Sequence, residues 1–206
     1  MKYLSIWDLL LPPIYIFLIY VFSSYRKHKL ERFNPAYKYY TAGLMAKLGC
    51  AIAICLIYTL YYSSGDSTGY YEQAMAIHNL LYKDPSYFFD VMFNGTSPEN
   101  YSYFDDTTGY VDYHTWVNDY SAMYISRLVA PLCMLSFNSF VTVTILLAWI
   151  CYPGIWKLYL LFCEQFPEIK KELAISLLFI PSVVFWGSGL LKDTVTLSSI
   201  GWYSYC

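Results

Sequence analysis

Two charged residues stand where an apolar stretch of the sequence ends. Asp66 follows one such stretch, and Tyr70 and Tyr71 come shortly after it. A carboxylate in this position can take the proton of a substrate hydroxyl as a general base. Lys192, followed by Asp193, closes another apolar stretch, and its ammonium group can stabilise a phosphate. The sequence therefore contains a candidate catalytic residue, Asp66, and a candidate substrate-binding residue, Lys192, with the two tyrosines as further candidates for substrate binding.

Each candidate also has a purely structural interpretation. Asp66 can cap a helix where the chain leaves a membrane, which is the commoner role of Asp at such a position. Lys192 can be a plain stop signal at the end of a span. Asp105 and Asp106 offer the hard oxygen ligands that divalent cations prefer, yet an acidic pair before Thr-Thr-Gly is more often a solvated turn. A divalent metal ion is therefore the one cofactor that the sequence leaves open, with Asp105 and Asp106 as weak candidate ligands.

The composition excludes a soluble domain. Hydrophobic residues make up 57% of the chain and charged residues 14%, whereas soluble domains have roughly 45–50% and 25%. The net charge of −2, with no basic stripe outside one short loop, argues against a nucleic-acid partner. The chain is predicted to be an integral membrane protein whose partners include membrane lipid.

The apolar stretches predict an all-α fold in a single membrane domain, residues 1–206, with four to five transmembrane helices. The residues between Arg127 and Lys157 exceed one span and are divided into an interfacial helix followed by a span. Lys47, near the start of the second span, can extend its long side chain to the interface. The expected spans are about 9–25, 42–62, 139–160, 173–191 and a partial one at 194–206.

The distribution of charge predicts the orientation. Residues 23–47 contain six basic residues, whereas residues 63–126 contain one basic residue and nine acids. Because basic loops stay in the cytoplasm, the N-terminus and residues 63–126 are expected outside. The outer loop, 63–127, contains too many aromatic residues for a disordered segment. We expect a helix over Ser67–Tyr82 and a surface helix over residues 121–137.

Two motifs resemble a known family. Gly65-Asp66-Ser67 with the Tyr-Tyr pair, just after a span, resembles the first outer loop of the GT-C superfamily of polytopic membrane glycosyltransferases. Residues 179–194, which contain Trp-Gly-Ser-Gly-Leu-Leu-Lys-Asp, are similar to a stretch in an uncharacterised bacterial branch of such proteins. The resemblance implies transfer of a sugar from a polyprenyl-phosphate-linked donor at the outer face of the bacterial inner (plasma) membrane, with Asp66 as the acid of the first loop.

That resemblance has limits and alternatives. GT-C enzymes have many more spans, so we expect this chain to be the N-terminal part of a longer protein. Some polysaccharide polymerases carry a similar Pro, Trp-Ser and Lys pattern, so a polysaccharide polymerase or ligase is the second hypothesis. A non-catalytic membrane subunit, whose outer loop docks partner membrane subunits, is the third hypothesis. If the chain is an enzyme, Asp66 and Lys192 should meet at one cavity, with Tyr70, Tyr71, Asp105 and Asp106 on its walls.

Overall fold

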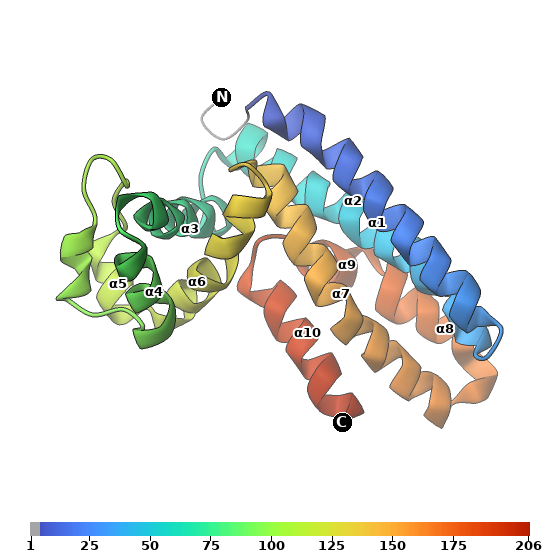
Figure 1. Ribbon diagram of the computed structural model, residues 1–206. Helices are drawn as coiled ribbons and strands as arrows, with labels where there is room; N and C mark the ends of the chain where they lie inside the picture. Colours follow the sequence, from blue (N-terminus) through green and yellow to red (C-terminus); the bar gives the residue numbers. More distant parts are fainter. Residues whose placement is uncertain (1–4) are drawn as a thin grey trace.

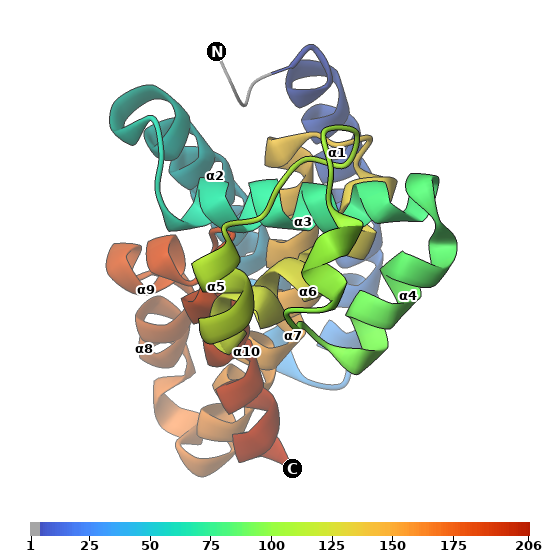
Figure 2. The ribbon, with the colours of Figure 1, turned by 90° about the vertical axis from the view of Figure 1, so that its left-hand side faces the viewer.

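The computed structural model describes residues 5–206, and this part of the chain is helical without strands (Figure 1). Long helices pack side by side in one part, and a group of shorter helices lies at one end of them (Figures 1 and 2). The helices in chain order are α1 (Trp7–Glu31), α2 (Tyr40–Ile57), α3 (Asp66–Lys83), α4 (Pro85–Asn94), α5 (Tyr113–Asn118), α6 (Tyr120–Leu135), α7 (Phe140–Gln165), α8 (Lys170–Ala174), α9 (Pro181–Trp186) and α10 (Lys192–Tyr205).

Three helical stretches are long and apolar enough to cross a membrane. They are α1, the run Pro35–Tyr62 that contains α2, and α7. Ser139 caps α7 by accepting a hydrogen bond from the amide of Thr142. Asp8 of α1 accepts hydrogen bonds from Ser139 and from the amide of Val141, which joins the beginnings of α1 and α7. The three helices match the first three expected spans.

The fourth expected span, 173–191, is not one continuous helix. The chain passes from α8 through a π-helical turn to Ile180, which is extended, and begins again as α9 at Pro181. The ring of a proline disfavours helical backbone angles in the residue before it, so the helix ends before Pro181. Within residues 5–206 the structure thus has three helical stretches long and apolar enough to cross a membrane, whereas four to five transmembrane helices were expected. Residues 187–191 form a buried turn before α10.

Lys47 also differs from the expectation. Its side chain does not extend to an interface: the residue is only 3% exposed, near the middle of the apolar run Pro35–Tyr62. Its ammonium donates a hydrogen bond to the carbonyl oxygen of Gly187, the residue that ends α9. The cation therefore stays inside the helical layer and contacts the buried turn.

The segment between α2 and α7 is ordered, as its aromatic content predicted. The expected helix Ser67–Tyr82 is confirmed as α3, and the expected surface helix is confirmed as a helix, α6. α3 packs along α6, with α4 and α5 beside them (Figure 2). Trp116 is fully buried here; its indole N–H donates to the Ser97 carbonyl at 2.9 Å, and its ring meets that of Phe104. These contacts give the segment its own aromatic core.

α10 crosses α7 at a pair of glycines. A Cβ atom on Gly154 would lie 2.1 Å from the carbonyl oxygen of Ser198, and one on Gly201 would lie 2.0 Å from the carbonyl oxygen of Gly154. The two backbones therefore touch, as in small-residue crossings of membrane helices. This contact fixes α10, whose first residue is Lys192, against the longest helix of the structure.

Candidate functional site

Asp66 is the first residue of α3, and the preceding glycine sets its position. Gly65 has φ +150°, and a Cβ atom there would lie 2.6 Å from the ring of Tyr58. Only glycine fits both the backbone angle and the contact. The N-cap position belongs to Gly65, and no side chain caps this helix. Asp66 is exposed and has no hydrogen-bond or ion-pair partner among residues 5–206.

Lys192 lies at the start of α10 and contacts the beginning of α6. Its ammonium donates to Ser121 Oγ at 2.7 Å and forms an ion pair with Asp119 at 3.3 Å. The same nitrogen lies 5.7 Å from the centre of the Tyr70 ring, within the range of a cation–π contact. Residues far apart in the sequence thus surround one cation, and Lys192 is partly exposed among them.

Tyr70 connects this cation to Asp66. Burial raises the pKa of the Tyr70 hydroxyl, the Asp66 carboxylate raises it further, and Lys192 lowers it. Both charges therefore lie close enough to act on one phenol. The structure brings together Asp66, Tyr70 and Lys192, three of the residues singled out from the sequence. We call these three, together with Asp119 and Ser121, the junction cluster.

Asp119 and Ser121 are the members that sequence reasoning missed. Asp119 caps α6 by accepting a hydrogen bond from the amide of Ala122 at 2.9 Å. The Ser121 hydroxyl, then the Ala122 amide and the nearby Lys192, lower the pKa of Asp119 to about 2, so it is ionised at neutral pH. An Asp just before an apolar, helically spaced run is a capping signal and could have been found. Its ion pair with Lys192 joins distant segments and had no sequence signal.

Tyr71 lies apart from the junction cluster. Its hydroxyl donates to the carbonyl of Asn138, and its ring packs on Phe140 with centroids 5.0 Å apart. Consecutive helical residues point about 100° apart, so Tyr70 and Tyr71 cannot share a wall. Tyr71 instead helps to hold α3 against the start of α7.

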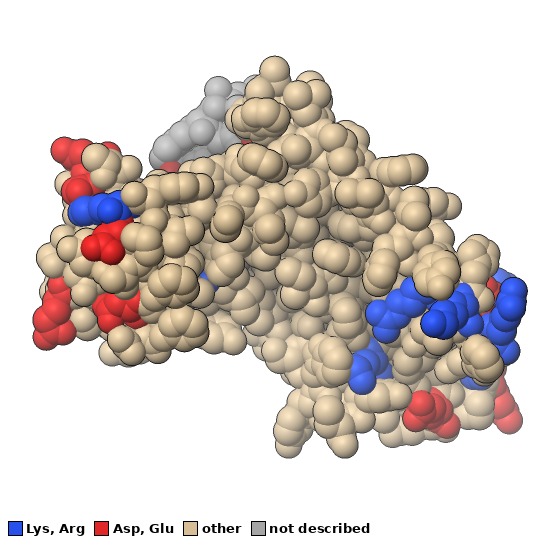
Figure 3. Space-filling view, viewed as in Figure 1, with Lys and Arg blue, Asp and Glu red and all other residues tan. Residues whose placement is uncertain are grey.

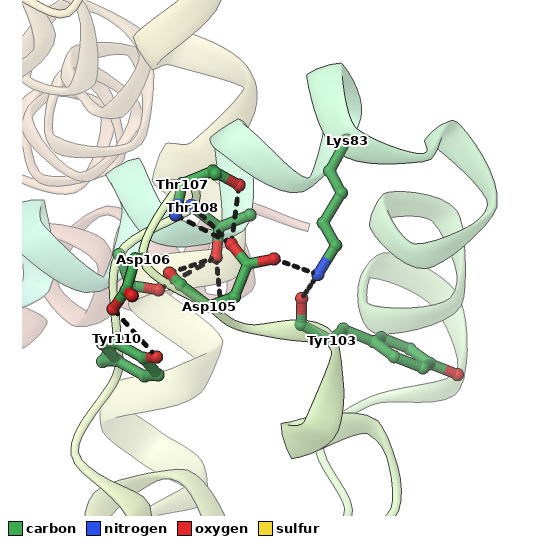
Figure 4. Close-up of polar contacts among 8 residues, drawn as sticks. Lys83, Tyr103, Asp105, Asp106, Thr107, Thr108 and Tyr110 are labelled. Carbon is green, nitrogen blue, oxygen red and sulfur yellow. Dashed lines mark hydrogen bonds and ion pairs between the residues drawn. The ribbon is translucent and has the colours of Figure 1, made fainter.

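Asp105 and Asp106 also lie apart, at the other end of α3 (Figure 4). Asp105 forms an ion pair with Lys83, the last residue of α3, at 2.7 Å. The 18 residues of α3 place Lys83 roughly 25 Å along the helix from Asp66 at 1.5 Å per residue. The expected placement of this acidic pair on the wall of the same site is therefore wrong.

The local contacts of the acidic pair match the turn interpretation. Asp105 Oδ1 accepts hydrogen bonds from the Thr107 amide at 2.8 Å and the Thr107 hydroxyl at 2.6 Å. Lys83 and these donors hold the pKa of Asp105 well below its usual range. Asp106 accepts a hydrogen bond from Tyr110. Nowhere in residues 5–206 do three or more His, Cys, Asp or Glu side chains form a group that could hold a metal ion.

Charged side chains separate along the long axis of the molecule. In the view of Figure 3, acidic side chains gather over the helices between α2 and α7, and most of the visible Lys and Arg side chains gather at the opposite end of α1 and α7. The junction cluster lies between these regions, where the shorter helices meet α10.

Comparisons with protein-family models, with curated protein sequences and with solved structures found no match.

Proposed function

We propose that this chain takes part in GT-C-like transfer of a sugar from a lipid-phosphate-linked donor to an acceptor at a membrane surface. The observation that carries the proposal is the junction cluster. Asp66, a carboxylate without a partner among residues 5–206, and Lys192, a cation over the Tyr70 ring, both lie near this tyrosine although they come from distant parts of the chain. A base and an anion partner are the two groups that this reaction needs.

The proposal includes an orientation. The charge separation supports placing residues 63–126 and the N-terminus outside and the basic end in the cytoplasm of a bacterial plasma membrane. The junction cluster would then lie near the outer head-group level, with α8 to α9 as a broken crossing. A polyprenyl phosphate keeps its tail in the bilayer and its phosphate at this level. The substrate would therefore approach from the lipid.

The chemistry follows from the two charges. Asp66 would take the proton of the acceptor hydroxyl while the hydroxyl oxygen forms a bond to the anomeric carbon of the donor. The bond between that carbon and the phosphate oxygen breaks, and the lipid phosphate leaves with the electron pair. Lys192 would stabilise the negative charge on the leaving phosphate. Tyr70, beside both charges, would form one wall of the sugar site.

Replacing Asp66 by Asn in the full-length protein tests the catalytic role. Asn keeps the size of the side chain but cannot accept the proton. Transfer from a panel of polyprenyl-phosphate monosaccharides in nanodiscs should fall by about 10²–10⁴-fold, with membrane insertion unchanged. The matched control is Asp84→Asn, because Asp84 caps α4 and Asn caps a helix equally well; it should retain activity.

Lys192→Ala tests the phosphate role separately. It should weaken binding of polyprenyl monophosphate by about tenfold, a typical value for one charge-assisted hydrogen bond, and leave binding of the neutral polyprenol unchanged. Normal transfer by Asp66→Asn would refute the catalytic assignment and favour the membrane-subunit hypothesis.

A further inference from the structure

The most unusual polar group outside the junction cluster is the Lys47 ammonium. It is buried among apolar residues of α2, α7 and the α8–α9 segment, including Tyr152, Leu178 and Val184. It has no ion pair with a carboxylate in the part of the chain that the structure describes, and the thiols of Cys50 and Cys151 lie near it. Burying a charged group among apolar side chains costs free energy, so an ammonium group in this position is expected to have a structural or functional role.

The group that Lys47 holds is the end of α9. Its ammonium donates to the carbonyl of Gly187, which leaves the helix at its C-terminus. Such a carbonyl has no partner within its own helix and needs an external donor when buried. The space beside Lys47 is about 10 Å³, the scale of one water molecule. Lys47 therefore supplies a donor that bulk water cannot easily supply.

A second contact on the same face of α2 holds the same turn. A Cβ atom on Gly189 would lie 2.9 Å from Ile54, which stands seven residues after Lys47 and so on the same side of the helix. From the first turn of α10, the Thr194 hydroxyl donates to the Gly189 carbonyl at 2.6 Å. Residues 187–191 thus lie fixed between α2 and the beginning of α10.

We propose that Lys47 is a positioning residue: its hydrogen bond to Gly187 holds the 187–191 turn on α2 and so sets Lys192 beside Tyr70 and Asp119. The turn ends one residue before Lys192 and Leu191 is extended, so a shift of the turn moves the Lys192 backbone directly. The consequence for phosphate binding rests on the proposed function. The positioning itself does not.

Spin-label distances test the positioning without any substrate. In full-length protein lacking its native cysteines, one pair of labels is attached at Tyr120 and Asp193, which are exposed neighbours of Asp119 and Lys192. A control pair is attached at Phe33 and Phe166, exposed residues at the other end of the long helices. Lys47→Met should lengthen or broaden the first distance and leave the second unchanged, whereas Lys47→Arg should retain both.

A binding measurement then separates the two proposals. Lys47→Met should weaken polyprenyl monophosphate binding about tenfold, with no further loss when combined with Lys192→Ala. Changed distances with unchanged binding would support the positioning and count against the lipid-phosphate function. An unchanged distance between the first pair would overturn the positioning. If Lys47→Met does not insert, Lys47→Leu, which likewise has no N–H donor, replaces it: a changed first distance supports the positioning, and an unchanged one overturns it.

Discussion

At the scale of single residues, the acids between α2 and α7 divide by what their carboxylates bind. Asp84, Asp112 and Asp119 cap α4, α5 and α6, and Asp105 closes a turn with Lys83. Each of these carboxylates therefore has a structural task. Asp66 has none within the described chain, although it stands in the first turn of α3, where a negative charge is favourable. Asp66 and Lys192 both lie near Tyr70, which is why we propose chemistry there.

Asp119 gives a pH-dependent prediction at this scale. Its pKa of about 2 in the folded chain lies below the unfolded value of about 3.9. Its ionised form therefore stabilises the fold above about pH 4, and this contribution is lost as the pH falls through 2. Asp119→Asn keeps the helix cap and removes only the charge. Because the ion pair is partly exposed, the variant should lose less than about 1 kcal/mol at pH 7.

Thermal unfolding in detergent between pH 7 and pH 2 checks this prediction. The difference between the wild type and Asp119→Asn should stay constant from pH 7 to about pH 5, then shrink at lower pH. A difference that grows on acidification would show that the Asp119 charge opposes folding.

At the scale of helices, the crossing of α7 and α10 depends on Gly154. A side chain at this position meets the backbone of Ser198, which cannot move as a flexible side chain could. Gly154→Ala should therefore destabilise the protein by about 1–3 kcal/mol, the usual cost of overpacking. The matched control is Gly49→Ala in the exposed face of α2, where a Cβ atom has nothing within 4 Å.

The control should be neutral or stabilise by up to about 1 kcal/mol, because Ala is a better helix former than Gly. Unfolding temperatures of both variants in the same detergent provide the measurement. Equal stabilities of the two variants would mean that α7 and α10 do not touch at Gly154.

At the scale of the whole molecule, most of the Lys and Arg side chains visible in Figure 3 lie at one end, together with a few acidic side chains, and the other end is mainly acidic. The proposed orientation makes a direct prediction for exposed residues at each end. With native cysteines removed, Ser102→Cys should react with a membrane-impermeant maleimide added outside intact cells, whereas Lys29→Cys should react only after the membrane is opened. Both side chains are exposed in the folded chain, so burial does not confuse the result. The opposite pattern would reverse the orientation.

The sequence by itself determined the features that depend on neighbouring residues or on the number and spacing of apolar residues in a segment. Apolar length predicted the three long helices, and the period of apolar residues predicted α3 and α6. The Asp and Ser residues before helices act through hydrogen bonds two or three residues away, so their capping role can be read locally.

Tertiary structure decided the rest, because the deciding contacts join residues far apart in the chain. Hydropathy counts residues 173–191 as one span, since it measures transfer to an apolar phase and not whether the backbone continues through Pro181 as a helix. Lys47 finds the Gly187 carbonyl and Lys192 finds Asp119 only after the helices have packed. Likewise Asp105 lies far from Asp66 because it pairs with Lys83 at the other end of α3, a rigid helix. The sequence of the following loop does not show to which end of α3 the loop returns.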